Sequence, residues 1–139
     1  MRKPSKKLVE KNISSNDSGE HSLKECPIFL TLSLIANKWS IRVLHSLLQA
    51  EKSTMRFGQI KKALPGITQR ELTKHLRVFE SCGIVDRKVF PEIPPRVEYT
   101  LTKLGHSLWK PIEELSSWAE KNAKFIQERK KSWEEAAAE

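Results

Sequence analysis

The chain has 139 residues, of which 38% are apolar and 30% are charged, and its formal net charge is +8. This length and apolar fraction suit one domain with a modest core, and the positive charge favours a polyanionic partner, with nucleic acid first and an anionic membrane surface second. No apolar run is long enough to cross a membrane, and the basic N-terminus has no apolar stretch behind it as a secretory signal would. We therefore expect a cytoplasmic protein without a membrane partner.

The two cysteines, Cys26 and Cys82, are too few and too far apart for a zinc site or a disulfide framework. No metal and no cofactor is therefore expected. The sequence also has no phosphate-binding loop, no nucleophile elbow and no clustered histidines. These features predict a protein that is not an enzyme.

The N-terminal segment is polar and rich in Lys, Ser and Asn, which predicts a disordered basic arm over residues 1–24. The arm is either a solvated tail without a role or a segment that touches nucleic-acid phosphates. Ordered structure is expected from residue 25, with a short helix starting near Pro27 and a second helix over residues 39–50. Residues 54–56 form either an edge strand or the lead into the next helix.

Two further helices are predicted on either side of a tight turn. Residues 57–64 have helical spacing and stop at Pro65 and Gly66, because proline is poorly tolerated in a helix interior and glycine permits the reversal. Thr68 and Glu71 have the spacing of a capping box that opens the next helix. The side chains expected on the buried faces of these helices are Phe57, Ile60, Ala63, Leu64, Leu72, Leu76 and Phe79.

Gly83 suits the position that ends the second of these helices, and Cys82 beside it is expected to pack inside. After Gly83 the hydrophobic period changes from 3.6 to about 2 residues. Residues 84–90 and 96–101 therefore predict two strands, and the proline-rich residues 91–95 predict the turn between them. The result is a hairpin.

A long helix capped by Thr102 is predicted to follow. Its apolar stripe is expected to comprise Leu104, Leu108, Ile112, Leu115, Ala119, Asn122 and Ile126. Trp109, Trp118 and Phe125 lie outside this stripe, so the helix carries more apolar surface than one intrachain face requires. Residues 127–139 predict a charged, fraying tail.

This order of elements predicts an α+β fold, mostly α: a winged helix-turn-helix over residues 25–126 that ends in a long C-terminal helix. In that arrangement the second helix of the turn enters the major groove of double-stranded DNA, and the hairpin forms the wing beside it. Residues 54–103 contain ten Lys or Arg against five Asp or Glu, which favours DNA over an ordinary solvated face. The side chains expected to contact DNA are Thr68, Gln69, Arg70, Thr73, Lys74, Arg77, Arg87, Lys88 and Arg96. For Arg87 the alternative is an ion pair with Glu98 across the hairpin.

Several stretches resemble the HxlR-type winged helix regulators of bacteria and archaea. They are Cys26-Pro27, residues 34–39, 56–60, 64–73 and 91–102, and Leu104-Gly105. The resemblance spans about residues 26–120. It implies a homodimer on a roughly palindromic operator, joined by the first helix and by the last one, which is thus a C-terminal dimerisation helix. The interface residues it implies are Ile28, Leu32, Leu115, Trp118, Ala119, Asn122 and Phe125. For Trp118 the alternative is packing within its own chain.

The resemblance also implies a signal, because relatives sense oxidants or electrophiles through the cysteine that Cys26 matches. The alternative is a capping or packing cysteine, in which case the effector is a small molecule or there is none. The function predicted overall is a sequence-specific DNA-binding transcriptional regulator, with repression as the default. The alternative function is an architectural or protein-contact module. Such a module would not require base-reading side chains such as Gln69, Arg70 and Thr73 at the start of the recognition helix.

Overall fold

The computed structural model describes residues 26–139, so the predicted basic arm at 1–24 lies outside the described part of the chain. The chain divides after Ala36 into two units. The first contains the helix α3 (Pro27–Ile35), which has a proline in its first turn and Cys26 as its N-cap. None of the helices in this structure is long and apolar enough to cross a membrane.

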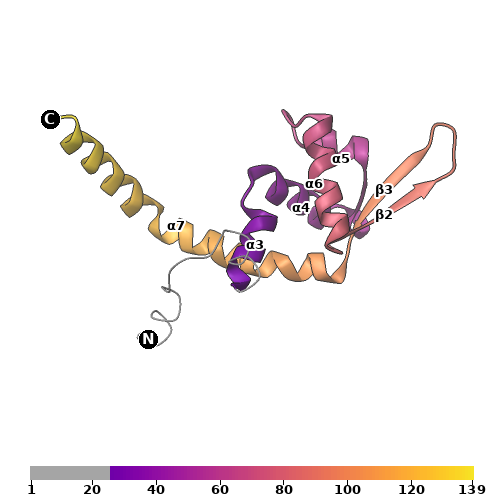
Figure 1. Cartoon of the computed structure of the whole chain (residues 1–139), viewed down its shortest axis with the longest axis horizontal. Coiled ribbons are helices and arrows are strands. Elements are labelled where there is room, and N and C mark those ends of the chain that lie inside the picture. The colour runs from indigo at the N-terminus through magenta and orange to yellow at the C-terminus, as the bar shows by residue number, and fades with distance from the viewer. Residues whose placement is uncertain (1–25) are drawn as a thin grey trace, which may run out of the picture. The chain divides into compact units, whose positions relative to one another are not determined.

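The second unit, residues 37–139, has the predicted order of helices around a small sheet (Figure 1). Its elements are α4 (Lys38–Gln49), the 3-10 helix η1 (Glu51–Ser53), β1 (Thr54–Arg56), α5 (Phe57–Ala63), α6 (Gln69–Ser81), β2 (Val85–Phe90), β3 (Arg96–Leu101) and α7 (Lys103–Ala137). The β2–β3 hairpin projects from the helices, and the C-terminal part of α7 runs clear of them. The predicted mostly α winged helix-turn-helix fold is confirmed.

The sheet is antiparallel and three-stranded, in the order β1-β3-β2. Residues 54–56 are therefore an edge strand rather than the lead into a helix, and β1 pairs with β3 in the register Thr54 to Thr100 and Arg56 to Glu98. The hydroxyls of Thr54 and Thr100 lie 2.8 Å apart across this pair. This third strand braces the base of the hairpin and leaves its outer end free.

The core of the unit lies between the sheet and helices α4, α5 and α6. Its fully buried side chains include Val43, Leu44, Leu47, Ile60, Leu72, Leu76, Phe79, Ile84 and Val85. Two expectations about the core are wrong, because Ala63 is exposed and Cys82 is an exposed free cysteine. Cys82 is the C-cap of α6, one turn beyond Phe79, where the helix no longer faces the core.

The long helix α7 differs most from its prediction. Only Gly105 and Ile112 are buried on it, whereas Leu104 and Leu115 of the expected stripe are 57% and 53% exposed. Residues 127–139 do not form a frayed tail, because α7 continues to Ala137. The helix thus packs through its N-terminal turns and leaves its later apolar residues uncovered within this unit.

Candidate DNA-binding surface

The turn between α5 and α6 is built from local hydrogen bonds. Gly66 has a φ of +94°, which L side chains rarely adopt, and the buried Ile67 donates its N–H to the carbonyl of Leu64 at 3.2 Å. At the start of α6, Thr68 Oγ1 accepts from the N–H of Glu71, and Glu71 Oε2 accepts from the N–H of Thr68, both at 3.1 Å. The predicted capping box is confirmed, and the bond from the Thr68 backbone lowers the pKa of Glu71 below its ordinary value.

Helix α6 has one buried and one polar face. Leu72, Leu76 and Phe79 are at most 1% exposed. The opposite face forms a hollow whose lining residues are Gln69, Arg70, Thr73, Lys74, Arg77 and Val78. Five of the predicted DNA contacts therefore gather on one surface that contains no carboxylate. Thr68, the predicted contact directly before α6, lies outside this hollow. Its hydroxyl is hydrogen-bonded to both the carboxylate and the N–H of Glu71.

The cations of this surface form no ion pairs within the described part of the chain. Arg70, Lys74 and Arg77 make no ion pair with any carboxylate among residues 26–139. The Thr73 hydroxyl donates to the carbonyl of Gln69 at 2.8 Å, so its oxygen remains available as an acceptor. A face with three unpaired cations and two neutral polar groups suits phosphate and base-edge contacts.

The wing places its two adjacent cations on opposite faces. Arg87 is paired with Tyr99 and Lys88 with Glu98, and successive residues of a strand point to opposite sides of the sheet. Arg87 thus shares the face of the buried Tyr99 and Leu101, which is the face covered by the helices. The alternative ion pair between Arg87 and Glu98 is not formed, and Arg87 is exposed.

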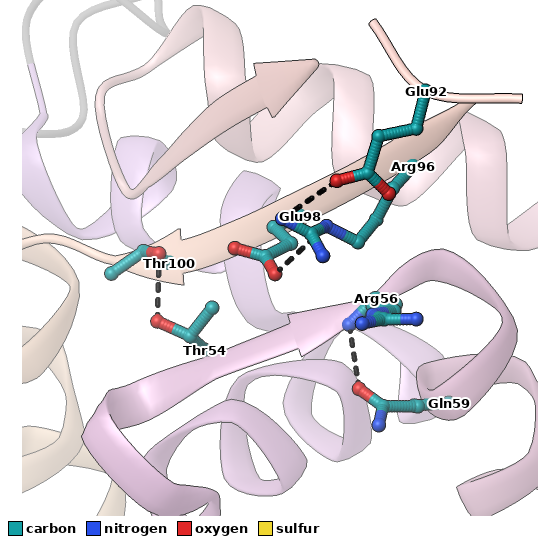
Figure 2. A network of polar contacts seen from close by, with 7 residues as sticks. All are labelled: Thr54, Arg56, Gln59, Glu92, Arg96, Glu98 and Thr100. Carbon is teal, nitrogen blue, oxygen red and sulfur yellow. Dashed lines mark hydrogen bonds and ion pairs between the residues drawn. The ribbon is translucent and has the colours of Figure 1, made fainter. Parts of the chain in front are cut away.

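The third wing cation, Arg96, is held by its own hairpin. Its Nη2 lies 3.4 Å from Glu92 Oε1, and its Nε lies 3.4 Å from Glu98 Oε1, an ion-pair distance without hydrogen-bond alignment (Figure 2). Its Cζ also lies 4.0 Å from the centroid of the Phe90 ring, over which Lys88 Nζ sits at 4.9 Å. The Arg96 side chain is only 25% exposed, so this cation is far less free than the arginines of α6.

One polar contact of the helix-turn-helix was not predicted. Ser40 is buried, and its Oγ lies 3.1 Å from Nδ1 of His75, which joins α4 to α6. Burial first, and then the charge of Lys74, lowers the pKa of His75, while Glu71 raises it. His75 follows the buried Leu72 by three positions and precedes the buried Phe79 by four, and this helical spacing was the available signal that the ring faces inward.

The residues of the predicted dimer interface lie on surfaces of their own units. On α7, Leu115, Trp118 and Phe125 are 53%, 60% and 66% exposed, and Asn122 donates its side-chain N–H to the carbonyl of Trp118 at 2.8 Å. Ala119 is also exposed.

On α3, considered by itself, Ile28 and Leu32 are 53% and 41% exposed. Cys26 is half-buried, and its carbonyl accepts from the N–H of Phe29 at 3.1 Å. Among residues 26–139, no three His, Cys, Asp or Glu side chains are grouped so as to hold a metal ion.

A capped recognition helix with an acid-free polar face, followed directly by a projecting hairpin, defines a winged helix-turn-helix DNA-binding protein. Comparison with known proteins gives the family. The model of the HxlR-like helix-turn-helix family matches residues 34–127, and the chain belongs to that family. The chain is thus a DNA-binding transcription regulator and not an enzyme, as its sequence predicted.

Individual relatives agree with this assignment. The chain is 36% identical over 118 residues to YybR, an uncharacterised HTH-type transcriptional regulator of Bacillus subtilis, covering 85% of this chain and 87% of YybR. Among solved structures, the reduced form of the redox regulator HypR matches with a TM-score of 0.64 and 34% identity, over 74% of this chain and 99% of that one. The reduced form of the regulator YodB from B. subtilis matches with a TM-score of 0.59 and 35% identity, over 68% of this chain and 90% of that one.

Proposed function

We propose that the chain is a homodimeric repressor that recognises a roughly palindromic operator through its two copies of α6. The observation that carries this proposal is the acid-free hollow on α6. In it, Gln69, Arg70 and Thr73 occupy the first turns, which in helix-turn-helix proteins contact base edges. A protein that acts on chromosomal promoters works in the cytoplasm.

We assign different roles to the predicted contacts. Gln69 and Arg70 suit bidentate contacts to purine edges, whereas Lys74 and Arg77, further along the helix, suit phosphates. Thr68 contributes by fixing the first turn of α6, because its hydroxyl is already bonded to Glu71. In the wing, Arg87 and Lys88 are the phosphate contacts.

Selection from a random duplex pool tests this function directly. Retained DNA should be enriched in a two-fold symmetric motif with half-sites about one helical turn apart. Arg70→Ala should then relax the preference at one base position of each half-site, and Lys74→Ala should weaken all duplexes equally. Retention without any enriched motif would instead favour an architectural or protein-contact role.

The dimer is proposed to form through the uncovered apolar residues of α7, together with those of α3. Sedimentation of a Phe125→Glu variant tests α7, since a charge in an apolar interface should raise the dimer dissociation constant at least tenfold. Gln127→Glu is the matched control, because it adds the same charge to an exposed site on another side of the helix. Equal dissociation of both variants would place the interface elsewhere.

Cys26 is proposed as the oxidant-sensing residue, since similar structures are of the redox regulator HypR and of the transcriptional regulator YodB in its reduced and diamide-treated forms. Cys26 is a free cysteine that is half-buried at the N-cap of α3, where an oxidant can reach it. A thiol oxidant should therefore release DNA from wild type and from Cys82→Ser, whose cysteine is also exposed, and leave Cys26→Ser bound. Release of Cys26→Ser would leave a small-molecule effector as the remaining signal.

A further inference from the structure

We propose that Arg96 is a positioning residue of the wing and not a phosphate contact, whereas Arg87 on the opposite face is a phosphate contact. The inference rests on the proposed operator binding. Arg96, Glu98 and Phe90 lie on one face of the hairpin, because Phe90 is paired with Arg96 and alternate residues of a strand share a face.

The Arg96 guanidinium has partners on several sides, although its buried Nε makes no hydrogen bond. Glu92 and Glu98 approach it at 3.4 Å each (Figure 2). The Phe90 ring centroid lies 4.0 Å from its Cζ. These three partners come from the outer end of β2, the turn and β3. The guanidinium therefore ties together the segments that shape the free end of the wing, which no other strand supports.

The carboxylates beside Arg96 also support a positioning role for it. Glu92 and Glu98 would both repel the DNA backbone if they were left uncompensated near it. Glu98 is also paired in register with Arg56 and Lys88, but of the cations in residues 26–139 only Arg96 lies within ion-pair distance of it. Arg96 thus cancels acidic charge that the wing itself contains, and a phosphate would have to compete with two carboxylates for it.

Arg87 has none of these partners. It is exposed, lies on the opposite face beside Val89, and forms no ion pair with a described carboxylate. The two arginines of the same hairpin therefore form a matched pair for experiment. Arg87 has no ion-pair partner among the described residues, whereas Arg96 contacts Glu92, Glu98 and Phe90.

The first test measures affinity for the selected duplex at several salt concentrations. Arg87→Ala should reduce the slope of log affinity against log salt by about 0.9 for each bound subunit. Arg96→Lys keeps the charge but loses the planar fork and its stacking, so affinity should fall about fivefold at every salt concentration without a change in slope. Wild-type affinity for Arg96→Lys would show a simple charge contact and overturn the proposal.

In a double-mutant cycle, the effect of Glu98→Gln on DNA affinity should have opposite signs in the wild-type and Arg96→Gln backgrounds. Glu98→Gln alone should weaken DNA binding about twofold because it loosens the hold on Arg96, whereas in an Arg96→Gln background it should strengthen binding by removing a repelling carboxylate. If Arg96 were a phosphate contact, Glu98→Gln would release it and strengthen binding in both backgrounds. That result would refute the proposed role.

The last test needs no DNA, so it separates this proposal from the proposed function. Amide hydrogen exchange of residues 87–99 in the free protein should become faster in Arg96→Gln and stay unchanged in Arg87→Ala. Unchanged exchange in Arg96→Gln would overturn the positioning role even if the protein binds its operator. Failure of wild type to bind any duplex would refute operator binding and leave the exchange result standing.

Discussion

Replacing Gly105 by alanine should destabilise the protein, although helix propensity predicts the opposite. Gly105 is buried in the first turn of α7, where alanine is favoured over glycine by about 1 kcal/mol. A Cβ built there would clash with the carbonyl oxygen of Ile84 and with the side chain of Leu101, whose Cγ would be 2.9 Å away. Overpacking of this kind costs up to about 3 kcal/mol, so the net loss in the free energy of unfolding should be about 2 kcal/mol.

The clash cannot relax easily, because the Ile84 carbonyl is held in place. It accepts from the N–H of Thr102 at 3.0 Å and shares the Thr102 hydroxyl, at 3.0 Å, with the carbonyl of Gly83. Urea denaturation followed by circular dichroism, at one protein concentration, measures the loss. Gly58→Ala in α5 is the matched control, since nothing lies within 4 Å of its new Cβ, and it should gain about 0.5 kcal/mol. A Gly105→Ala variant as stable as wild type would refute this reasoning.

Three further changes test the helix-turn-helix itself by the same denaturation assay. Thr68→Ala removes the N-cap of α6 and should lower the free energy of unfolding by about 1 kcal/mol, and an unchanged value would contradict the capping role. Gly83→Ala should cost about 1 kcal/mol, because the residue has a φ of +72°. For His75, whose pKa is lowered from 6.5, the stability it contributes is fully present above pH 6.5 and is lost as the pH falls below that value. His75→Gln, which has no ring to protonate beside Ser40, should lose less stability than wild type between about pH 7 and about pH 5.

The helix-turn-helix was predictable because its signals are local. Pro65 and Gly66 stop one helix, and Thr68 and Glu71 start the next within the same few residues, so no distant contact is needed to place α6. The outward face of α6 then follows from the buried stripe alone. All five side chains assigned to that face line one hollow, which is what a helical period requires.

The wing was predictable as a hairpin but not in its partners. Which side chains meet across two strands depends on the register, and a shift of one residue turns every side chain to the other face. With residues 91–95 as the turn, the alternation of apolar residues allows either Arg87 or Lys88 to lie opposite Glu98. The observed register places Lys88, not Arg87, opposite Glu98 and gives Arg96 the ring of Phe90.

The helix α7 shows what periodicity cannot decide. An apolar stripe predicts that a face is covered, but it does not say by which chain. Its first turns pack at Gly105 and Ile112, while Leu115, Trp118 and Phe125 remain exposed in the single chain. The expectation that Leu104 is inward was wrong for the same reason, because the helix turns a different row of residues toward the core.

The start of α7 also explains how a dimer made by this helix would set the distance between the two copies of α6. Thr102 caps α7 by accepting from the N–H of Gly105 at 3.1 Å, and its hydroxyl donates to the carbonyl of Gly83 at 2.6 Å, directly after the end of α6. The close approach of Gly105 to Ile84 adds a contact that a larger side chain could not make. Because α6 and α7 are joined here by hydrogen bonds and close packing, pairing of two α7 helices in the proposed dimer would fix the separation of the two recognition helices. The half-site spacing of the proposed operator would then depend on α7, and the bases read within each half-site would depend on α6.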